Sequence, residues 1–248
     1  MSSSAVPSSP APAEAGAFGR IIGVLFSPKA TFESIVRRPT WALPLILLCI
    51  LQLAVTFAFS QHVGWHDFMV RKLEQNPRVQ QMSEEDREKA IEKGTQIAPI
   101  IGYVSSLLVP FISAALVAAV LLAAFNLLAG SKVNFKTALG IVSHSWVPGI
   151  IMGLLGLLII FLKDPSAVDI ENLVASNGGA LLSENSSAWL IKLLTSLDIF
   201  SFWFMILMAM GFSATNPKKI SFGKAFAIVF AVWLIYVLVR TGSAAVSS

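Results

Sequence analysis

The chain has 248 residues, of which 55% are hydrophobic and only 13% are charged. Soluble domains carry about 25% charged residues, so this composition excludes a water-soluble globule and indicates a membrane protein. The net charge of +4 does not indicate nucleic-acid binding, because the cations flank apolar segments and do not alternate with aromatic residues along a groove. The single cysteine, Cys49, excludes a disulfide framework and a cysteine-rich metal site.

The N-terminal region contains a tail and then an amphipathic segment. Residues 1–16 are rich in Ser, Pro and Ala and lack the features of a secretory signal, so we expect a disordered tail. An apolar run follows, and Ser27 and Pro28 then predict a helix start, with Ser as the cap and Pro at the first helical position. We expect a short helix in the cytoplasmic headgroup layer, with basic side chains facing anionic lipid. These lipid-facing cations are Arg20, Lys29, Arg37 and Arg38.

Five apolar segments are long enough to cross about 30 Å of hydrocarbon at about 1.5 Å per residue. They cover residues 41–60, 103–127, 138–162, 193–212 and 222–239. The sequence therefore predicts an all-α fold, a polytopic membrane helical bundle with five transmembrane helices plus short interfacial and loop helices. The membrane domain is expected at residues 17–240, followed by a short tail at 241–248.

The loop between the first two spans, residues 61–96, is rich in both acids and bases and contains a capping pattern that begins at Ser83. It reads as a solvated helical insert, which Gly94 is expected to end. With this insert set aside, nine Lys and Arg lie on the N-terminal side of the membrane and three on the other. Positive charge favours the cytoplasm, so we expect a cytoplasmic N-terminus and an external C-terminus. Counting the insert in full gives nine on each side, so the orientation depends on its exclusion.

Asp198 is the sharpest candidate for a functional site, because a carboxylate within the fourth expected span is costly unless it is paired or wetted. In a transporter it could exchange protons or hold a cation. Alternatively it lies near a helix end, where a hydroxyl or a backbone N–H satisfies it. His144 could relay a proton or bind a metal, or could bond to a neighbouring helix. Asn126 is expected to join helices, and Gly149, Gly153, Gly156 and the alanines of the second span are expected to let helices pack closely.

No enzyme signature accompanies these residues. A Gly-x-Ser-x-Gly nucleophile is absent, and the spacing of His62 and His66 lacks the Glu of a zinc-protease motif. We therefore expect a protein without catalytic activity, cofactor or metal.

Three features resemble the Yip (Ypt-interacting protein) domain family, particularly its bacterial-type members, over residues 18 to 240. They are the segment Ser27-Pro28-Lys29-Ala30-Thr31-Phe32-Glu33, the pair Trp41 and Pro44 at the first span, and the charged stretch Met82-Ser83-Glu84-Glu85-Asp86-Arg87-Glu88-Lys89-Ala90. The resemblance implies a five-pass protein of the bacterial inner membrane. Eukaryotic members act in vesicle traffic and associate with small GTPases through a cytoplasmic N-terminal region, from which this short tail departs.

Two functions follow as expectations. The first is a non-enzymatic membrane protein that organises or recruits partners at the bilayer, either other proteins or a second copy of the chain. The alternative is a small transporter or proton-linked carrier that uses Asp198, with His144 as a relay.

Overall fold

The computed structural model describes residues 16–74, 76–183 and 186–247. Throughout these ranges the regular elements are α-helices and short 3-10 helices, which confirms the all-α expectation. The expected disordered tail lies outside the described residues except for Gly16. The helices are α1 (Ala17–Phe26), α2 (Pro28–Arg37), α3 (Ala42–His62), α4 (Trp65–Glu74), α5 (Pro77–Gln80), α6 (Glu84–Ala129), α7 (Phe135–Ser145), α8 (Pro148–Leu162), η1 (Pro165–Ala167), η2 (Gly178–Leu181), α9 (Ala188–Ser196), α10 (Ile199–Thr215) and α11 (Phe222–Ser247).

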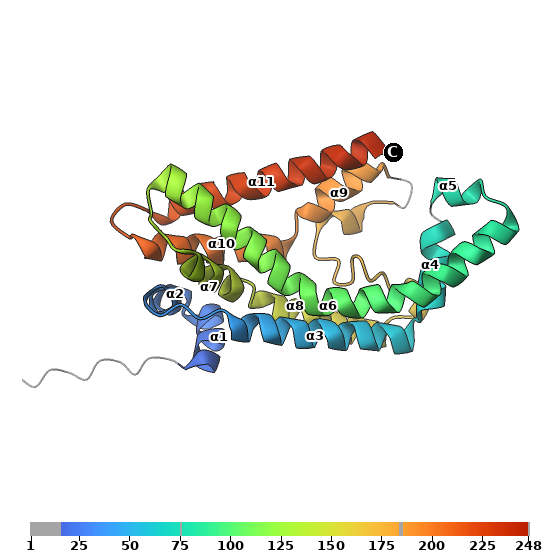
Figure 1. Cartoon of the computed structure of the whole chain (residues 1–248), viewed down its shortest axis with the longest axis horizontal. Coiled ribbons are helices and arrows are strands. Elements are labelled where there is room, and N and C mark those ends of the chain that lie inside the picture. The colour runs from blue at the N-terminus through green and yellow to red at the C-terminus, as the bar shows by residue number, and fades with distance from the viewer. Residues whose placement is uncertain (1–15, 75, 184–185, 248) are drawn as a thin grey trace, which may run out of the picture.

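The long helices run along the long axis of the molecule in alternating directions (Figure 1). Helices α1 and α2 lie at one end of this axis, together with the turn between α10 and α11. The C-terminus lies toward the other end, beside α9, and α4 and α5 project there as a separate arm. The two ends of the described chain are therefore far apart along the axis.

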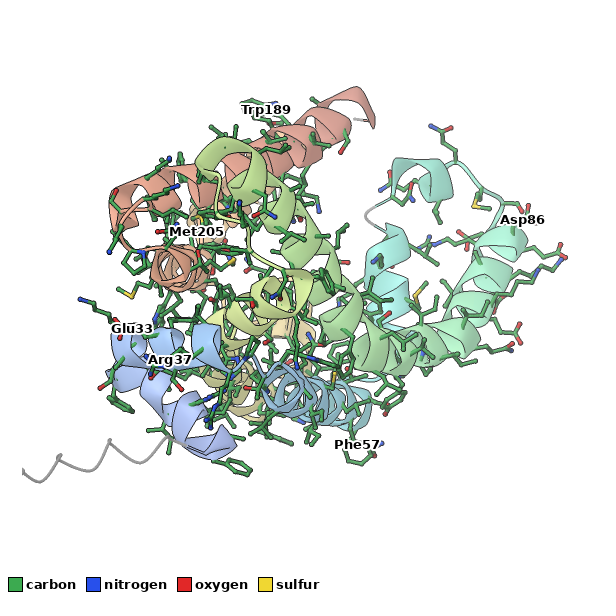
Figure 2. All side chains as sticks on the ribbon, turned by 60° about the vertical axis from the view of Figure 1, so that its left-hand side comes forward. Glu33, Arg37, Phe57, Asp86, Trp189 and Met205 are labelled. Carbon is green, nitrogen blue, oxygen red and sulfur yellow. The ribbon has the colours of Figure 1, made fainter. Side chains whose placement is uncertain are left out.

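Among the described residues, four helical segments are long and apolar enough to cross a membrane. They are Ala42–His62, Glu84–Ala129, Phe135–Leu162 and Phe222–Ala245. The chain is thus a multi-pass membrane protein, and large apolar side chains such as Phe57 point outward from the bundle (Figure 2).

The expected fourth span, residues 193–212, is not one helix. The chain breaks at Leu197 and Asp198, between α9 and α10. Helix α10 has 17 residues and is about 25 Å long, which is shorter than a typical hydrocarbon core. The five-span count is therefore not confirmed. The break has a local cause, because Asp198 begins α10 as its N-cap residue.

The last part of the loop insert, from residue 84, and the second span form one continuous helix, α6, of 46 residues. Ser83 caps it as expected, since its side chain accepts a hydrogen bond from Asp86 N. The prediction that Gly94 ends a helix is wrong. A glycine inside a helix costs only about 1 kcal/mol, and Gly94 packs closely against Met69 of α4. At about 69 Å the helix is much longer than a bilayer core, so part of it projects into the arm with α4 and α5 (Figure 1).

The main core lies where α2, α6, α7, α10 and α11 meet. The rings of Phe125 and Phe212 stack there with centroids 4.2 Å apart and planes at 5°. Gly211 lies against Ile141, and a Cβ added at this glycine would be 3.0 Å from Phe32 Cδ1. Since Ile141 and Phe32 are both fully buried, this crossing has no room for a larger residue.

Small residues permit the other close approaches, as expected. Gly149 and Gly153 lie against leucines of α3, whereas Gly156 lies against a leucine of the 163–187 loop. Ala114 and Ala118 of α6 are fully buried in the main core. These surfaces are used within the chain for helix packing.

Candidate functional site

Asp198 is buried, with 8% of its surface exposed, and all its observed partners are donors. Its Oδ1 accepts hydrogen bonds from Phe200 N at 2.9 Å and Ser201 N at 3.1 Å. Its Oδ2 accepts a hydrogen bond from Ser176 Oγ. Ile199 N also donates to Ser176 O at 3.2 Å, which ties the start of α10 to the preceding loop. The carboxylate thus stabilises a helix N-terminus, where negative charge is favoured.

A cleft of about 950 Å³ opens beside Asp198. Helices α3, α6 and α8 supply much of its wall, and the loop after α8, α9, α10 and Arg240 of α11 complete it. Thr56 and Ser106, on α3 and α6, share a hydrogen bond of 2.7 Å at this wall. Asp198 therefore caps a helix, as one reading of the sequence predicts, and it also lines a partly polar cleft.

His144 lies elsewhere. It is buried with 1% exposure in α7, and its Nδ1 donates to Gly140 O at 2.8 Å, one turn earlier in the same helix. The charged neighbour with an electrostatic effect on its ring is Arg20, and His144 does not line the cleft. The structure therefore does not bring His144 and Asp198 together as a relay.

Asn126 is a loop anchor. Its Nδ2 donates to Val133 O at 3.0 Å, and its Oδ1 accepts from Val133 N at 2.9 Å and from Ser131 Oγ at 2.8 Å. Three of its four hydrogen-bonding positions are thus filled by the turn between α6 and α7. It fixes that turn and does not join two helices across the bundle.

The expected lipid-facing cations divide into two groups. Lys29, Arg37 and Arg38 are exposed, and Figure 2 shows Arg37 on α2 near Glu33. For Arg20 the expectation of a lipid-facing side chain is wrong, because only 5% of its surface is exposed. Its guanidinium points into the protein.

Arg20 forms a clamp between the two N-terminal helices and the entry to α3. Its Nη1 donates to Arg38 O at 2.8 Å and to Thr40 Oγ1 at 3.0 Å, and its Nη2 donates to Ser34 Oγ at 3.0 Å. The sequence pattern of α1 does indicate that Arg20 points away from lipid. The apolar residues at positions 18, 22 and 26 lie on one face of α1, and Arg20 lies off that face.

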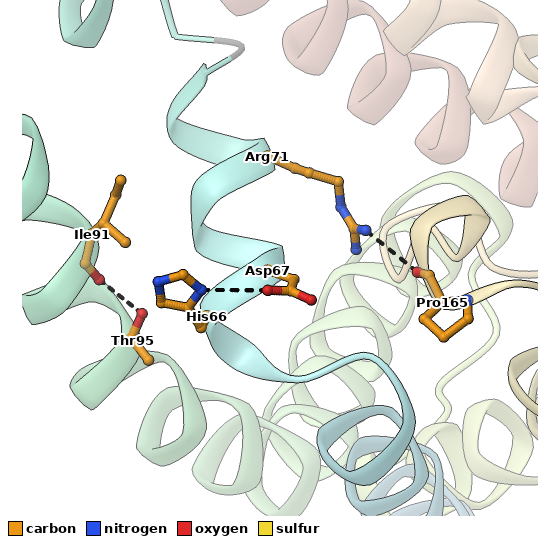
Figure 3. Close-up of polar contacts among 6 residues, drawn as sticks. All are labelled: His66, Asp67, Arg71, Ile91, Thr95 and Pro165. Atoms are coloured by element: carbon orange, nitrogen blue, oxygen red, sulfur yellow. Dashed lines mark hydrogen bonds and ion pairs between the residues drawn. The ribbon is translucent and has the colours of Figure 1, made fainter.

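The loop after α8 is held against α4 by polar contacts. Arg71 Nη1 donates to Pro165 O and to Ser166 O, each at 3.3 Å (Figure 3). Lys72 Nζ forms an ion pair of 2.7 Å with Glu171, and this hydrogen bond lowers the pKa of the Glu171 carboxyl. His66 instead pairs with its neighbour Asp67 at 3.3 Å (Figure 3). Within the described ranges, no group of three or more His, Cys, Asp or Glu could hold a metal ion.

Comparison with known proteins adds one finding to this geometry. Residues 22–242 match the model of the Yip1 domain family. No curated protein and no solved structure matches the chain.

Proposed function

This chain belongs to the Yip1 domain family, and from that premise we propose that it is a non-enzymatic membrane protein that organises or recruits partners at the cytoplasmic membrane surface. The proposed docking element is the α1–α2 platform, residues 17–37. The observation that carries the proposal is the Arg20 clamp, which fixes both helices of the platform to the entry of the first membrane-spanning helix.

The outer face of the platform suits a membrane surface. Phe18, Ile22 and Phe26 are 67%, 61% and 81% exposed, and their spacing places them on one face of α1. An apolar stripe of this kind, next to cations, is typical of a helix that lies in the interface. Lys29 and Arg37 are exposed on the neighbouring helix, and each cation near anionic lipid contributes about 1 kcal/mol.

A fixed platform also favours recruitment of partners. Ordering a mobile segment on binding has an entropic cost, and a segment already held in place avoids much of that cost. The partner is proposed to be another protein or a second copy of this chain. The stability of the platform comes from buried contacts, so its exposed cations remain available for binding.

We place the protein in a bacterial inner membrane with the platform in the cytoplasm and the C-terminus outside. The distribution of Lys and Arg in the short loops supports this orientation. In this proposal α9 and α10 together form a fifth, discontinuous crossing. The position of α1 and of the C-terminus toward opposite ends of the long axis is consistent with that arrangement (Figure 1).

Partner capture from native membranes tests the proposal. Lys29→Gln with Arg37→Gln removes two exposed platform charges, and Lys218→Gln with Lys219→Gln removes two exposed charges from the turn between α10 and α11. Quantitative mass spectrometry after in-membrane crosslinking should show partners lost in the first variant and kept in the second. Reporter fusions at both termini verify that neither variant changes topology. Identical partner sets in both variants would contradict a recruiting role for the platform.

A second candidate, a proton-linked carrier that uses Asp198, is favoured by one observation. Asp198 lines the cleft at a break between two helices, and broken helices build the substrate sites of many transporters. In sealed vesicles the parent should then show pH-dependent flux that Asp198→Asn abolishes. Flux of the same pH dependence in both proteins would exclude Asp198 as the proton carrier.

A further inference from the structure

The cleft beside Asp198 has two chemically different parts. Helices α3, α6 and α8 line one part mainly with small or apolar residues such as Leu51, Val109 and Met152, among which α3 and α6 also contribute an amide and hydroxyls but no charge. The loop after α8, α9 and the end of α11 line the other part with amides, hydroxyls and charges. A site that is uncharged and mainly apolar between membrane-spanning helices and charged at one end matches an amphipathic ligand.

The acids in the polar part already have partners. Asp198 accepts hydrogen bonds from three donors. Glu171 is paired with Lys72 at 2.7 Å, and Asp169 accepts a hydrogen bond from Glu171 N at 2.8 Å. Lys72 thus balances the charge of Glu171, and neutral donors stabilise the carboxylates of Asp198 and Asp169.

The two cations of the polar part are less engaged. Among the residues that the structure describes, the Arg240 guanidinium makes one long hydrogen bond, from Nη1 to Ser196 Oγ at 3.5 Å, although a guanidinium has five N–H donors. Within the described ranges, no hydrogen bond or close ion pair engages Lys192 Nζ, and the lysine contributes only a longer-range attraction to Glu171. Lys192 and Ser196 are one turn apart on α9, and the Ser196 hydroxyl donates to Lys192 O at 2.8 Å. Both half-buried cations line the cleft, and both residues are hydrogen-bonded to Ser196.

We propose that this cleft binds one anionic phospholipid, with Lys192 and Arg240 contacting the phosphate and the walls of α3, α6 and α8 contacting the upper acyl chains. The volume of about 950 Å³ lies at the upper end of the range for ligand pockets and accommodates a headgroup with part of its chains. A lipid is favoured over a soluble anion, because the apolar walls belong to helices that cross the membrane. This site is separate from the α1–α2 platform, so the two proposals can fail independently.

Native mass spectrometry of the purified full chain in detergent tests the site, with phosphatidylglycerol as the anionic probe and phosphatidylcholine as the zwitterionic one. Lys192→Gln with Arg240→Gln should weaken phosphatidylglycerol binding about thirtyfold, since each cation near anionic lipid contributes about 1 kcal/mol, which is about fivefold in affinity. Phosphatidylcholine carries the same phosphate, but its choline cation offsets the charge, so its binding should weaken much less. Lys218→Gln with Lys219→Gln removes equal charge outside the cleft and should leave both affinities unchanged.

A charge-preserving variant separates binding from folding. Lys192→Arg with Arg240→Lys should retain phosphatidylglycerol affinity within about threefold of the parent, because both cations remain. The proposal is overturned by unchanged affinity in the neutralised variant, by an equal loss in either the outside control or the charge-preserving variant, or by an equal loss for phosphatidylcholine. Glycerol phosphate that binds as tightly as the lipid, with the same dependence on the two cations, would show a site for soluble anions instead.

Discussion

Replacing Arg20 with Met should loosen the α1–α2 platform while the rest of the bundle stays folded. Methionine keeps much of the apolar stem and removes the guanidinium. Three hydrogen bonds of 2.8 to 3.0 Å disappear with it, and they join α1 to Ser34, to Arg38 O and to Thr40. The acceptors are left without these donors in a region where Arg20 itself is only 5% exposed.

The size of the effect follows from burial. Breaking a buried charged network by removing one partner typically costs about 3–5 kcal/mol. Two of the three acceptors are hydroxyls, which can rotate toward new partners, so we expect a smaller cost of about 2–3 kcal/mol. At about 1.4 kcal/mol per factor of ten, the opening of the platform should become roughly 30-fold to 150-fold more frequent.

Hydrogen exchange in detergent micelles measures this opening directly, because amide protection reports local unfolding. Protection of residues 17–37 should fall by that factor, and protection of the core helices should change little. The matched control is Arg37→Met, which removes the same charge from an exposed position on α2. Unchanged protection in Arg20→Met, or an equal loss in Arg37→Met, would refute the clamp.

Three further changes test the core, the helix break and the loop. Gly211→Ala should destabilise the bundle by about 1–3 kcal/mol, because its Cβ meets fully buried side chains, whereas Gly223→Ala has open space and should be neutral or stabilising in denaturant titrations. Asp198→Ala should cost about 0.5–2 kcal/mol in the same assay, and Asp198→Asn much less because Asn also caps helices; equal losses would contradict the capping role. The pKa of Glu171 is lowered from its ordinary value of 4.5, so its contribution to stability is present above that pH and is lost as pH falls through the lowered pKa. The protection factors of the loop after α8, which compare exchange with the intrinsic rate at each pH, should therefore fall slightly toward pH 3 in the parent but not in Lys72→Met. The expected loss of local stability is less than about 1 kcal/mol.

Hydropathy predicted the long helices because membrane crossing depends on length and composition. The expected spans at 41–60 and 222–239 correspond to α3 and α11, and α11 continues to Ser247 through most of the expected tail. Hydropathy was less informative about where one helix ends and the next begins. The helix of the insert and the second span were expected to be separate, yet α6 joins residues 84–96 of the insert to the span, since neither Gly94 nor the charges around it are strong helix breakers.

The sequence suggested the helix end at Asp198 but not the long-range contact that accompanies it. The hydroxyls and the uncertain helix boundary near residue 198 suggested a capped helix end, and the structure has Asp198 as the cap of α10. Its long-range donor, Ser176, lies 22 positions earlier in the chain. No periodicity or motif places that hydroxyl beside Asp198, because the contact depends on the path of the loop after α8.

Arg20 and Asp198 together show why local hydropathy does not predict the free-energy cost of placing a charged side chain in this fold. Arg20 follows an apolar residue near the start of a helix and was expected to reach anionic lipid, whereas Asp198 lies in an apolar stretch and was expected to be costly. Both are buried and both are hydrogen-bonded, Arg20 through its two Nη atoms to carbonyl and hydroxyl acceptors and Asp198 to backbone and hydroxyl donors, while Arg20 Nε has no partner in the described part of the chain. Lys192 and Arg240 are only half-buried, but fewer close contacts engage their charges. Unmet hydrogen-bonding capacity, more than depth of burial, therefore identifies the charges that are available to a ligand.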